Sequence, residues 1–346
     1  MSHRTDAGGS APTLATVADE AGVSRQTVSN ALNSPELLRP DTLARVQEAI
    51  DRLGYSPNRA ARSLRTRSSH LVGLRVEPAV EDSANALMDR FVHSLVESTR
   101  EAGYHVLLFS ADAEHDVTDG YDELLRSAAV DAFVVTDTYR GNPQAVWLAQ
   151  RGVPFVAFGR PWGEPAARHP WVDVDGRAGV VQAVDHLVER GHSRIAWVGW
   201  QKGSYIGEDR RSGWVDQMHA HGLSTSRLSA RGDDTLEFGG RAARALLDVE
   251  PSEAPTAFVC ASDTLAMGVL RTCDELALRA GRDVAVVGFD DSIPAQVTTP
   301  GLTSVRQPLE QVAVEVVHYL GELLSHRPIP DLGCVLTPTL RVRETS

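Results

Sequence analysis

The 346-residue sequence has no apolar run near the length of about 18 residues that a membrane-spanning helix needs, so no such helix is expected. Its three cysteines, Cys260, Cys273 and Cys334, are too few and too widely spaced for a disulfide framework or a zinc site. Residues 1–12 are polar and lack the apolar stretch of a secretory signal. We therefore expect a reduced, cytoplasmic protein without membrane association.

The sequence also lacks the short motifs that mark common enzymes. It has no G-x-G-x-x-G turn after a predicted strand, no Walker A run, no G-x-S-x-G elbow, no H-E-x-x-H and no C-x-x-C. His186 and His192 flank a predicted helix without a suitably spaced partner, so we predict no metal site and no cofactor. Acidic pairs such as Asp173/Asp175 are as consistent with ligand hydrogen bonds as with catalysis. The sequence thus favours a binding protein over an enzyme.

What is present is an uneven distribution of charge. The net charge of −12 alone argues against a nucleic-acid partner. Residues 1–67, however, contain nine arginines against seven acids, whereas the rest of the chain carries about −14. A slightly basic head on an acidic body differs from a uniformly acidic protein, and the head has to be interpreted separately.

The head contains three short predicted helices. Residues 14–21 have apolar side chains at the i, i+3, i+4 and i+7 positions, the spacing of one buried helical face. Gly22 ends this helix, and Ser24 is a suitable N-cap for a second helix over 25–32. A third helix is predicted over 40–53, with proline in its first turn. Two helices joined by a tight glycine turn and braced by a third form a helix-turn-helix arrangement.

Residues 56–67 join this head to the body and contain four arginines and no acid. Few of their side chains suit a hydrophobic core. One interpretation is a solvated linker, and the other is a segment that becomes ordered only against phosphates.

From His70 onward, short apolar runs alternate with longer amphipathic stretches, which predicts βαβ units, parallel sheets and two lobes around a cleft. The predicted strands span 71–76, 105–110, 132–136, 155–158, 194–199, 257–261, 285–288 and 303–306. The predicted helices span 84–102, 121–128, 143–150, 176–190, 208–221, 239–247, 263–278 and 309–324.

Several segments resemble the LacI/GalR family of bacterial transcriptional regulators. Residues 13–33, TLATVADEAGVSRQTVSNALN, are similar to the DNA-binding head of that family, and the similarity continues through LGYSPNRAARSL at 53–64. In the body, the family's own sequence is resembled by GHSRI at 191–195, ASDTLAMG at 261–268 and VVGFDD at 286–291. The resemblance runs over essentially the whole chain from Thr13.

This resemblance implies an all-α helix-turn-helix head and a two-lobed α/β body like a periplasmic binding protein, with Rossmann-like parallel sheets. It implies a disordered tail over 1–12, a DNA-binding domain over 13–57 and a hinge helix over 58–69. Residues 70–346 would form a ligand-binding and dimerisation domain, crossed by three strands between its lobes.

The family places the second head helix in the major groove of double-stranded operator DNA. Its polar residues suit this role, because arginine pairs with guanine, and glutamine and asparagine pair with adenine. Asn30 departs from the arginine usual in the family, so the operator sequence cannot be carried over. The alternative is an ordinary solvated helix face. The base-contacting candidates are Arg25, Gln26, Ser29 and Asn30, and the phosphate-contacting candidates are Thr13, Ser24 and Thr27.

The arginine-rich segment resembles the family's hinge helix, which folds on operator DNA in the minor groove. Leu64 matches the residue that wedges between base pairs, although packing between domains is an alternative. Ala61, one turn earlier, is small enough for two hinge helices to approach closely. Asn58 and Arg62 would contact phosphates or minor-groove edges.

In the body, the resemblance aligns Arg210 with the ligand-clamping arginine of the family and Asp290 with a ligand-binding acid. Asp175 and Asp263 are weaker candidates, since each is also placed to cap a following helix. Phe91, Trp162 and Phe289 are candidates for an apolar platform under a sugar ring, or else core residues. Acids at 233 and 234, where the family often has an aromatic, favour a polyhydroxylated or cationic ligand over an anionic one.

The sequence therefore predicts a homodimeric, ligand-responsive DNA-binding regulator, a repressor of a carbohydrate-utilisation operon that a sugar releases. The sequence does not give the sign of the response, the effector or the regulated genes. One alternative is a solute-binding protein without a transcriptional role, and another is an enzyme on a doubly wound fold.

Overall fold

The computed structural model describes residues 12–55, 68–76, 86–110, 118–136 and 138–346, and the chain separates into two units, residues 1–69 and 70–346. Within the described ranges, each helix is too short or too polar to span a lipid bilayer. Almost all of the predicted N-terminal tail, and most of the predicted hinge helix, lie outside these ranges.

The first unit is built from α1 (Leu14–Ala21), α2 (Arg25–Asn33), the short 3-10 helix η1 (Pro35–Leu37) and α3 (Pro40–Leu53), which confirms the three predicted helices. One valine from each α-helix, Val17, Val28 and Val46, is fully buried at the centre of the unit. Gly22 follows α1 with φ at +64°, a left-handed conformation that favours glycine and turns the chain tightly into α2.

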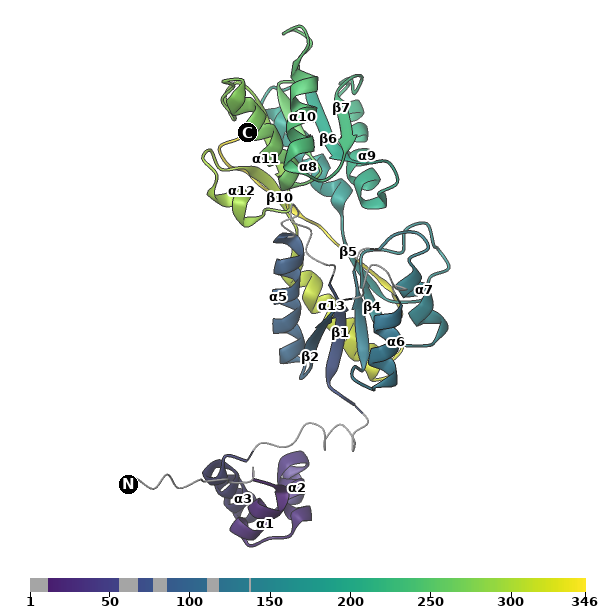
Figure 1. The fold of residues 1–346 in the computed structure, drawn as a ribbon, viewed down its shortest axis with the longest axis vertical. Coiled ribbons are helices and arrows are strands. Elements are labelled where there is room, and N and C mark those ends of the chain that lie inside the picture. The colour runs from purple at the N-terminus through teal and green to yellow at the C-terminus, as the bar shows by residue number, and fades with distance from the viewer. Residues whose placement is uncertain (1–11, 56–67, 77–85, 111–117, 137) are drawn as a thin grey trace, which may run out of the picture. The chain divides into compact units, whose positions relative to one another are not determined.

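The second unit contains two lobes, each built on a six-stranded sheet (Figure 1). In lobe 1 all strands are parallel, in the order β11-β5-β4-β3-β1-β2. Alternate residues face opposite sides of this sheet: Val134 packs with α5 and α13, whereas Phe133 and Val135 pack with α6 and α7. Its elements are β1 (Leu71–Arg75), α5 (Ala86–Glu101), β2 (His105–Phe109), α6 (Asp119–Arg126), β3 (Ala132–Val135), α7 (Pro143–Gln150), β4 (Phe155–Phe158), β5 (Trp171–Val174), α13 (Leu309–Leu324) and β11 (Gly333–Leu336).

Lobe 2 has the strand order β12-β10-β9-β8-β6-β7, with only the edge strand β12 antiparallel among the described strands. Every residue of β8 and β9 is buried, as expected for parallel strands with helices on both faces. Its elements are α8 (Gly176–Glu189), β6 (Ile195–Trp200), α9 (Tyr205–Ala220), β7 (Ser229–Gly232), α10 (Leu236–Leu247), β8 (Ala257–Cys260), α11 (Asp263–Glu275), β9 (Ala285–Phe289), α12 (Ile293–Val297), β10 (Thr303–Arg306) and β12 (Thr339–Arg341).

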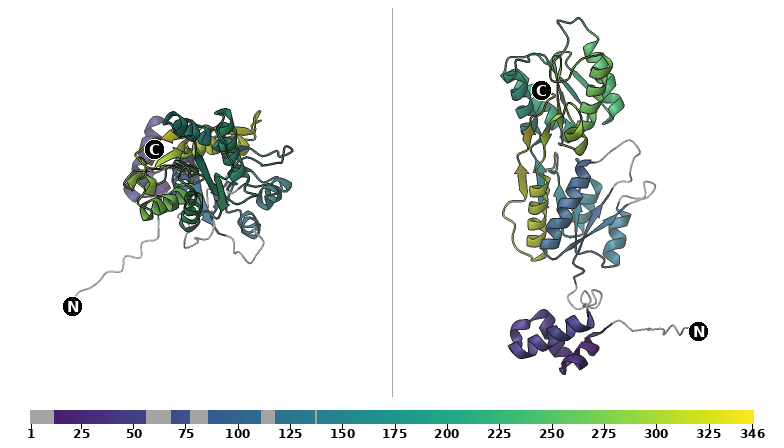
Figure 2. Two further views of the ribbon diagram at one scale, coloured as in Figure 1. Left: turned by 90° about the horizontal axis from the view of Figure 1, so that it is seen from above. Right: turned by 90° about the vertical axis from the view of Figure 1, so that its left-hand side faces the viewer.

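The chain passes between the lobes three times, after β5, after β10 and after β11. Figure 2 shows the last of these segments entering lobe 2, where the C-terminus lies. The observed architecture confirms the predicted fold class, an α-helical head with a two-lobed α/β body of largely parallel sheets.

Two predicted helix starts are wrong by one turn. α9 begins at Tyr205, three residues before the predicted start, because Ser204 caps its first turn. α10 begins at Leu236, again three residues early, because Thr235 is the cap. The strands β5, β7, β11 and β12 were not predicted, since none of them has the four consecutive apolar residues found in the predicted strands β3, β4 and β8.

Candidate functional site

One side of α2 carries polar side chains, while the opposite side packs into the core. Val28 is fully buried, Arg25 and Gln26 are exposed, and Ser29 and Asn30 are half-buried. All four predicted base-contacting residues therefore belong to one short helix whose orientation the core fixes. This placement is compatible with the predicted role, which stays a prediction.

Two of these side chains are coupled to each other. The Gln26 Nε2 donates a hydrogen bond to Asn30 Oδ1 at 2.9 Å, one helical turn away. This bond occupies one donor of Gln26 and an acceptor of Asn30. The Gln26 Oε1 acceptor and the Asn30 Nδ2 donors take no part in this bond and remain available to a base edge. We therefore expect the pair to recognise a base edge as one unit.

The predicted phosphate-contacting residues stand at helix N-termini. Thr13 Oγ1 accepts from the Thr16 amide at 3.3 Å, and Ser24 Oγ accepts from the Thr27 amide at 3.1 Å. Neither α1 nor α2 has an acid in its first turn. The positive end of each helix dipole is therefore not neutralised locally, which suits a phosphate group. The predicted hinge residues Asn58, Ala61, Arg62 and Leu64 lie outside the described residues.

In lobe 2, the carboxyl ends of the parallel strands bring polar side chains to one edge of the sheet, as expected for a ligand site in such folds. Arg210, from α9, is 4% exposed at this edge. Its guanidinium carbon lies 3.6 Å from the ring centroid of Phe289 and 5.0 Å from that of Trp200. The two aromatic rings therefore hold the guanidinium in one orientation.

Within the part of the chain that the structure describes, the hydrogen bonds of Arg210 leave one edge of the guanidinium without an acceptor. Nη1 donates to the Ala261 carbonyl at 2.5 Å. Nη2 is 3.8 Å from Asp290 Oδ1, which is an ion pair but not a hydrogen bond. Nε is buried and has no acceptor among the described residues. The Nε–Nη2 edge is thus suited to a ligand that offers two oxygen acceptors side by side.

Asp290, just after β9, is the acid beside this edge. Its side chain is 18% exposed, and Oδ1 accepts from Gln307 Nε2 at 2.7 Å. Burial raises the pKa of Asp290 to about 7, Arg210 opposes the rise, and the nearby carboxylate of Asp263 adds to it. Its backbone φ of +109° is unusual for a non-glycine residue and marks a constrained position.

The raised pKa makes a testable prediction about stability. The unfolded chain ionises at Asp290 near pH 4, so this residue's contribution to the free energy of unfolding is present at low pH and lost as the pH rises through about 7. Asp290→Asn removes the loss, so we expect the variant to gain about 2 kcal/mol relative to the parent between pH 5 and pH 8. Urea unfolding followed by circular dichroism measures this difference.

The control for this experiment is Asp283→Asn. Asp283 is hydrogen-bonded to Arg279, which lowers its pKa to about 2, so the effect of its substitution should not change between pH 5 and pH 8. A difference between the parent and Asp290→Asn that is equally independent of pH would contradict the prediction.

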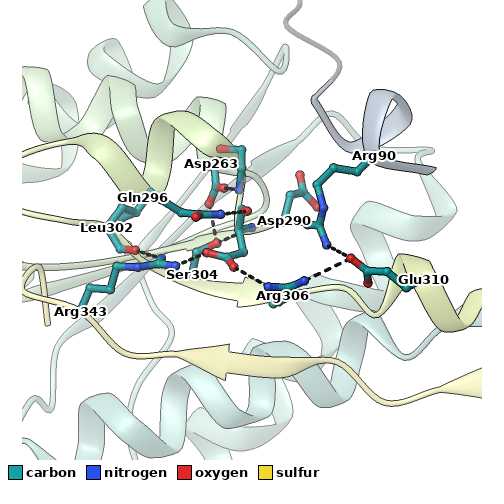
Figure 3. Close-up of polar contacts among 11 residues, drawn as sticks. Arg90, Asp263, Asp290, Gln296, Leu302, Ser304, Arg306, Glu310 and Arg343 are labelled. Atoms are coloured by element: carbon teal, nitrogen blue, oxygen red, sulfur yellow. Dashed lines mark hydrogen bonds and ion pairs between the residues drawn. The ribbon is translucent and has the colours of Figure 1, made fainter. Parts of the chain in front are cut away.

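Asp263, predicted as a weaker ligand candidate or a helix cap, does not cap α11, and its role as a ligand residue stays a prediction. Its Oδ1 accepts from Ser304 Oγ at 2.6 Å, and its Oδ2 accepts from the Ser292 amide at 2.7 Å (Figure 3). The N-cap of α11 is the preceding residue, Ser262. Asp263 therefore fixes the connection between β9 and α12, and through it the position of Asp290.

The other predicted effector residues have different surroundings. Asp175 is the N-cap of α8, because its Oδ1 accepts from the Ala178 amide at 2.8 Å. Phe91 is fully buried in the core of lobe 1, with its ring 4.6 Å from that of Phe158. Phe289 is also fully buried, but its face supports Arg210. The structure thus brings Arg210, Phe289 and Asp290 together and leaves Phe91 in a core.

A chain of charged contacts links this site to lobe 1. Arg90 of α5 donates to the backbone carbonyl of Asp290 at 3.2 Å and pairs with Glu310 of α13 at 3.2 Å (Figure 3). Glu310 also pairs with Arg306 at 3.1 Å, and Arg306 lies 4.0 Å from the buried carboxylate of Asp291. The backbone beside the candidate ligand residue is therefore held directly by a helix of the other lobe.

Several polar residues near Arg210 were not among the effector-binding residues predicted from the sequence. Arg160 of lobe 1 pairs with Asp173 and carries a buried Nη2 without an acceptor among the described residues. The Trp200 indole Nε1 is also buried without an acceptor there. Carboxylates of Asp173, Asp209, Asp234 and Asp290 all act on the pKa of Arg210, which burial lowers. The signals in the sequence were the acidic pairs at 173/175 and 233/234 and the position of Trp200 directly after a predicted strand.

Across the described ranges, His, Cys, Asp and Glu side chains nowhere gather in a group of three or more that could hold a metal ion.

Comparison with known proteins assigns both units. Residues 13–58 match the bacterial regulatory proteins of the lacI family, and residues 184–346 match a periplasmic binding protein-like domain. The HTH-type transcriptional regulator CelR from Thermobifida fusca is 35% identical over 341 residues, which cover 96% of this chain and 98% of CelR. The regulator AglR from Rhizobium meliloti is 31% identical, over 92% of this chain and 90% of AglR.

Solved structures agree with this assignment. A regulatory protein of the LacI family from Chloroflexus aggregans matches with a TM-score of 0.75 and 34% identity, over 80% of this chain and 98% of that protein. The CelR–cellobiose complex matches with a TM-score of 0.71 and 32% identity, over 97% of this chain and all of that one. These relatives are transcriptional regulators, not enzymes, and CelR aligns with head and body together. The chain is therefore a DNA-binding transcriptional regulator that belongs to the LacI family of bacterial regulatory proteins.

Proposed function

We propose that this regulator is a homodimeric, cytoplasmic repressor that binds a near-palindromic operator and is released from it by a neutral sugar. The observation that carries the sugar assignment is the Nε–Nη2 edge of Arg210, which lies beside Asp290. Sugar hydroxyls both accept from a guanidinium and donate to a carboxylate, so one ligand group satisfies both partners. The surplus of carboxylates around Arg210 disfavours an anionic ligand.

Two related proteins support the proposal of a dimeric, sugar-responsive repressor. CelR was solved with cellobiose, a neutral disaccharide, and the lac repressor was solved as a dimer bound to operator. In this chain, α12 exposes the apolar side chains of Ile293 and Val297, at 66% and 72%, which a second copy would bury. A two-fold dimer places two α2 helices on two half-sites of one operator.

The mechanism we propose is a shift between two arrangements of the lobes. A sugar held between Arg210 and residues of lobe 1 favours a closed cleft, and Arg90 connects α5 to the backbone of Asp290. Movement of lobe 1 would then separate the paired hinges over 58–69, in which Leu64 wedges between base pairs and Ala61 allows close approach. Asn58 and Arg62 would hold phosphates or minor-groove edges.

The test begins with operator selection from random duplexes, followed by fluorescence anisotropy with the selected duplex. We expect tight binding that weakens steeply between about 50 mM and 200 mM salt, because phosphate contacts release counterions. One member of a panel of neutral sugars should weaken operator binding at least about tenfold. Absence of salt-sensitive DNA binding would contradict the assignment as a repressor and would favour the alternative, a solute-binding protein.

A further inference from the structure

Two aromatic side chains, one from each lobe, stack against each other between the lobes. Trp162 lies in the β4–β5 connection of lobe 1, and Tyr205 is the first residue of α9 in lobe 2. Their ring centroids are 6.2 Å apart and their planes differ by 18°, so the rings face each other nearly in parallel. Both side chains are half-buried. Two parallel rings on opposite lobes change their separation whenever the lobes move.

Hydrogen-bond donors without acceptors accompany this pair. The Trp162 Nε1 is buried with no partner among the described residues, and so is Nη2 of Arg160, whose guanidinium carbon is 4.6 Å from the Trp162 ring centroid. Buried donors of this kind are normally satisfied, so their presence together indicates a polar ligand. An apolar ring face with donors at its edge matches a pyranose, which has C–H groups on its faces and hydroxyls around its rim.

The aromatic pair and Arg210 are connected through one helix, α9. Tyr205 and Arg210 are five residues apart on α9, a rise of about 7.5 Å along the helix axis. Between them, Asp209 interacts electrostatically with both Arg160 and Arg210. A row of interacting side chains thus runs from Arg210 past Asp209 and Arg160 to Trp162 and Tyr205.

Resting on the sugar effector proposed above, we propose that Trp162 and Tyr205 form a second sugar subsite, and that the effector is an oligosaccharide of at least two rings. Arg210 and Asp290 hold one ring, and the aromatic pair closes on the next. A ring between two aromatic faces needs two van der Waals contacts, about 7–8 Å in all, so a small opening beyond 6.2 Å admits it.

The experiment is isothermal titration calorimetry on the full-length protein with neutral monosaccharides and with disaccharides built from them, including glucose, cellobiose and maltose. We expect at least one disaccharide to bind about 10- to 100-fold more tightly than its component monosaccharides. Trp162→Ala and Tyr205→Ala should remove this advantage, while leaving any binding of the monosaccharide within about twofold. Tyr205→Phe, which keeps the ring, should retain it.

The outcomes separate the two proposals. If no sugar in the panel binds, the sugar effector itself fails, and this inference fails with it. If a monosaccharide binds as tightly as its disaccharides, or if Trp162→Ala weakens both equally, the effector proposal stands and the second subsite is refuted. An equal loss would mean that the aromatic pair acts as a latch between the lobes rather than as a sugar platform.

Discussion

Arg210→Ala is expected to yield a repressor that binds its operator normally and no longer responds to the effector. In the function proposed above, the side chain would supply two charge-assisted donors to the ligand. Each such bond contributes about 1.5–3 kcal/mol, so we expect effector affinity to fall at least about 100-fold. Calorimetry with the effector and anisotropy with the operator, both on the same preparation, measure the two properties separately.

Arg210→Lys tests whether geometry or charge is responsible. Lysine keeps the positive charge beside Asp290 but has no planar pair of N–H groups, so we expect most of the affinity to be lost here too. The matched control is Arg241→Ala on α10, where an exposed arginine pairs with Glu237 one turn away and lies 5.9 Å from the Phe238 ring centroid. That variant should bind the effector as the parent does.

Operator release from Arg210→Ala at the sugar concentration that releases the parent would contradict the assignment of the cleft. A loss of operator binding without sugar would instead indicate misfolding, which circular dichroism distinguishes. Arg210 is 4% exposed and lies between two aromatic rings, so its removal leaves a cavity as well as an unpaired carboxylate. Arg210→Met keeps most of the volume and provides a second, folded variant for the same test.

Gln26→Ala is the second substitution for which we expect a large effect, in this case on operator binding. A good contact to a base edge contributes about 1–3 kcal/mol of discrimination, and a dimer makes the contact in both half-sites. We therefore expect at least about 30-fold weaker binding to the selected operator, with little change in binding to random duplex. Anisotropy with both duplexes at one salt concentration gives the ratio.

The hydrogen bond between Gln26 and Asn30 makes a sharper prediction. Because the pair presents one acceptor and a set of donors as a unit, Asn30→Ala should also weaken operator binding, and the double variant should lose less than the sum of the single variants. Gln47→Ala is the control, since Gln47 is an exposed glutamine on α3. Additive losses from the two single variants would show that the side chains act independently.

Much of the head followed from local signals. The three helices are marked by caps, by glycine turns and by apolar spacing, all of which act within one or two turns of the chain. In the body, long amphipathic helices and strands buried on both faces were equally readable. The short strands β5, β7, β11 and β12 were not, because their pairing partners, rather than their own residues, make them strands.

The residues of the candidate site were also only partly predictable from the sequence. Sequence resemblance singled out Arg210 and Asp290, and the structure places them 3.8 Å apart. The sequence also suggested Phe91 and Asp263 as candidates, because their residue types suit a sugar site. In the structure, Phe91 lies in the core of lobe 1, and Asp263 accepts hydrogen bonds from Ser292 and Ser304. Residue type alone does not tell these cases apart, since an aromatic or an acid has the same chemistry in either place.

The sequence by itself determined that the chain has a slightly basic helix-turn-helix head, an acidic α/β body and the residues of a family of regulators. These properties depend on composition, on periodicity and on neighbours within a few residues. Only the tertiary structure decided which edge of Arg210 is available, why Asp290 has a raised pKa, and that Trp162 and Tyr205 face each other from different lobes. Burial and orientation depend on residues far apart in the chain, and only folding brings those residues together.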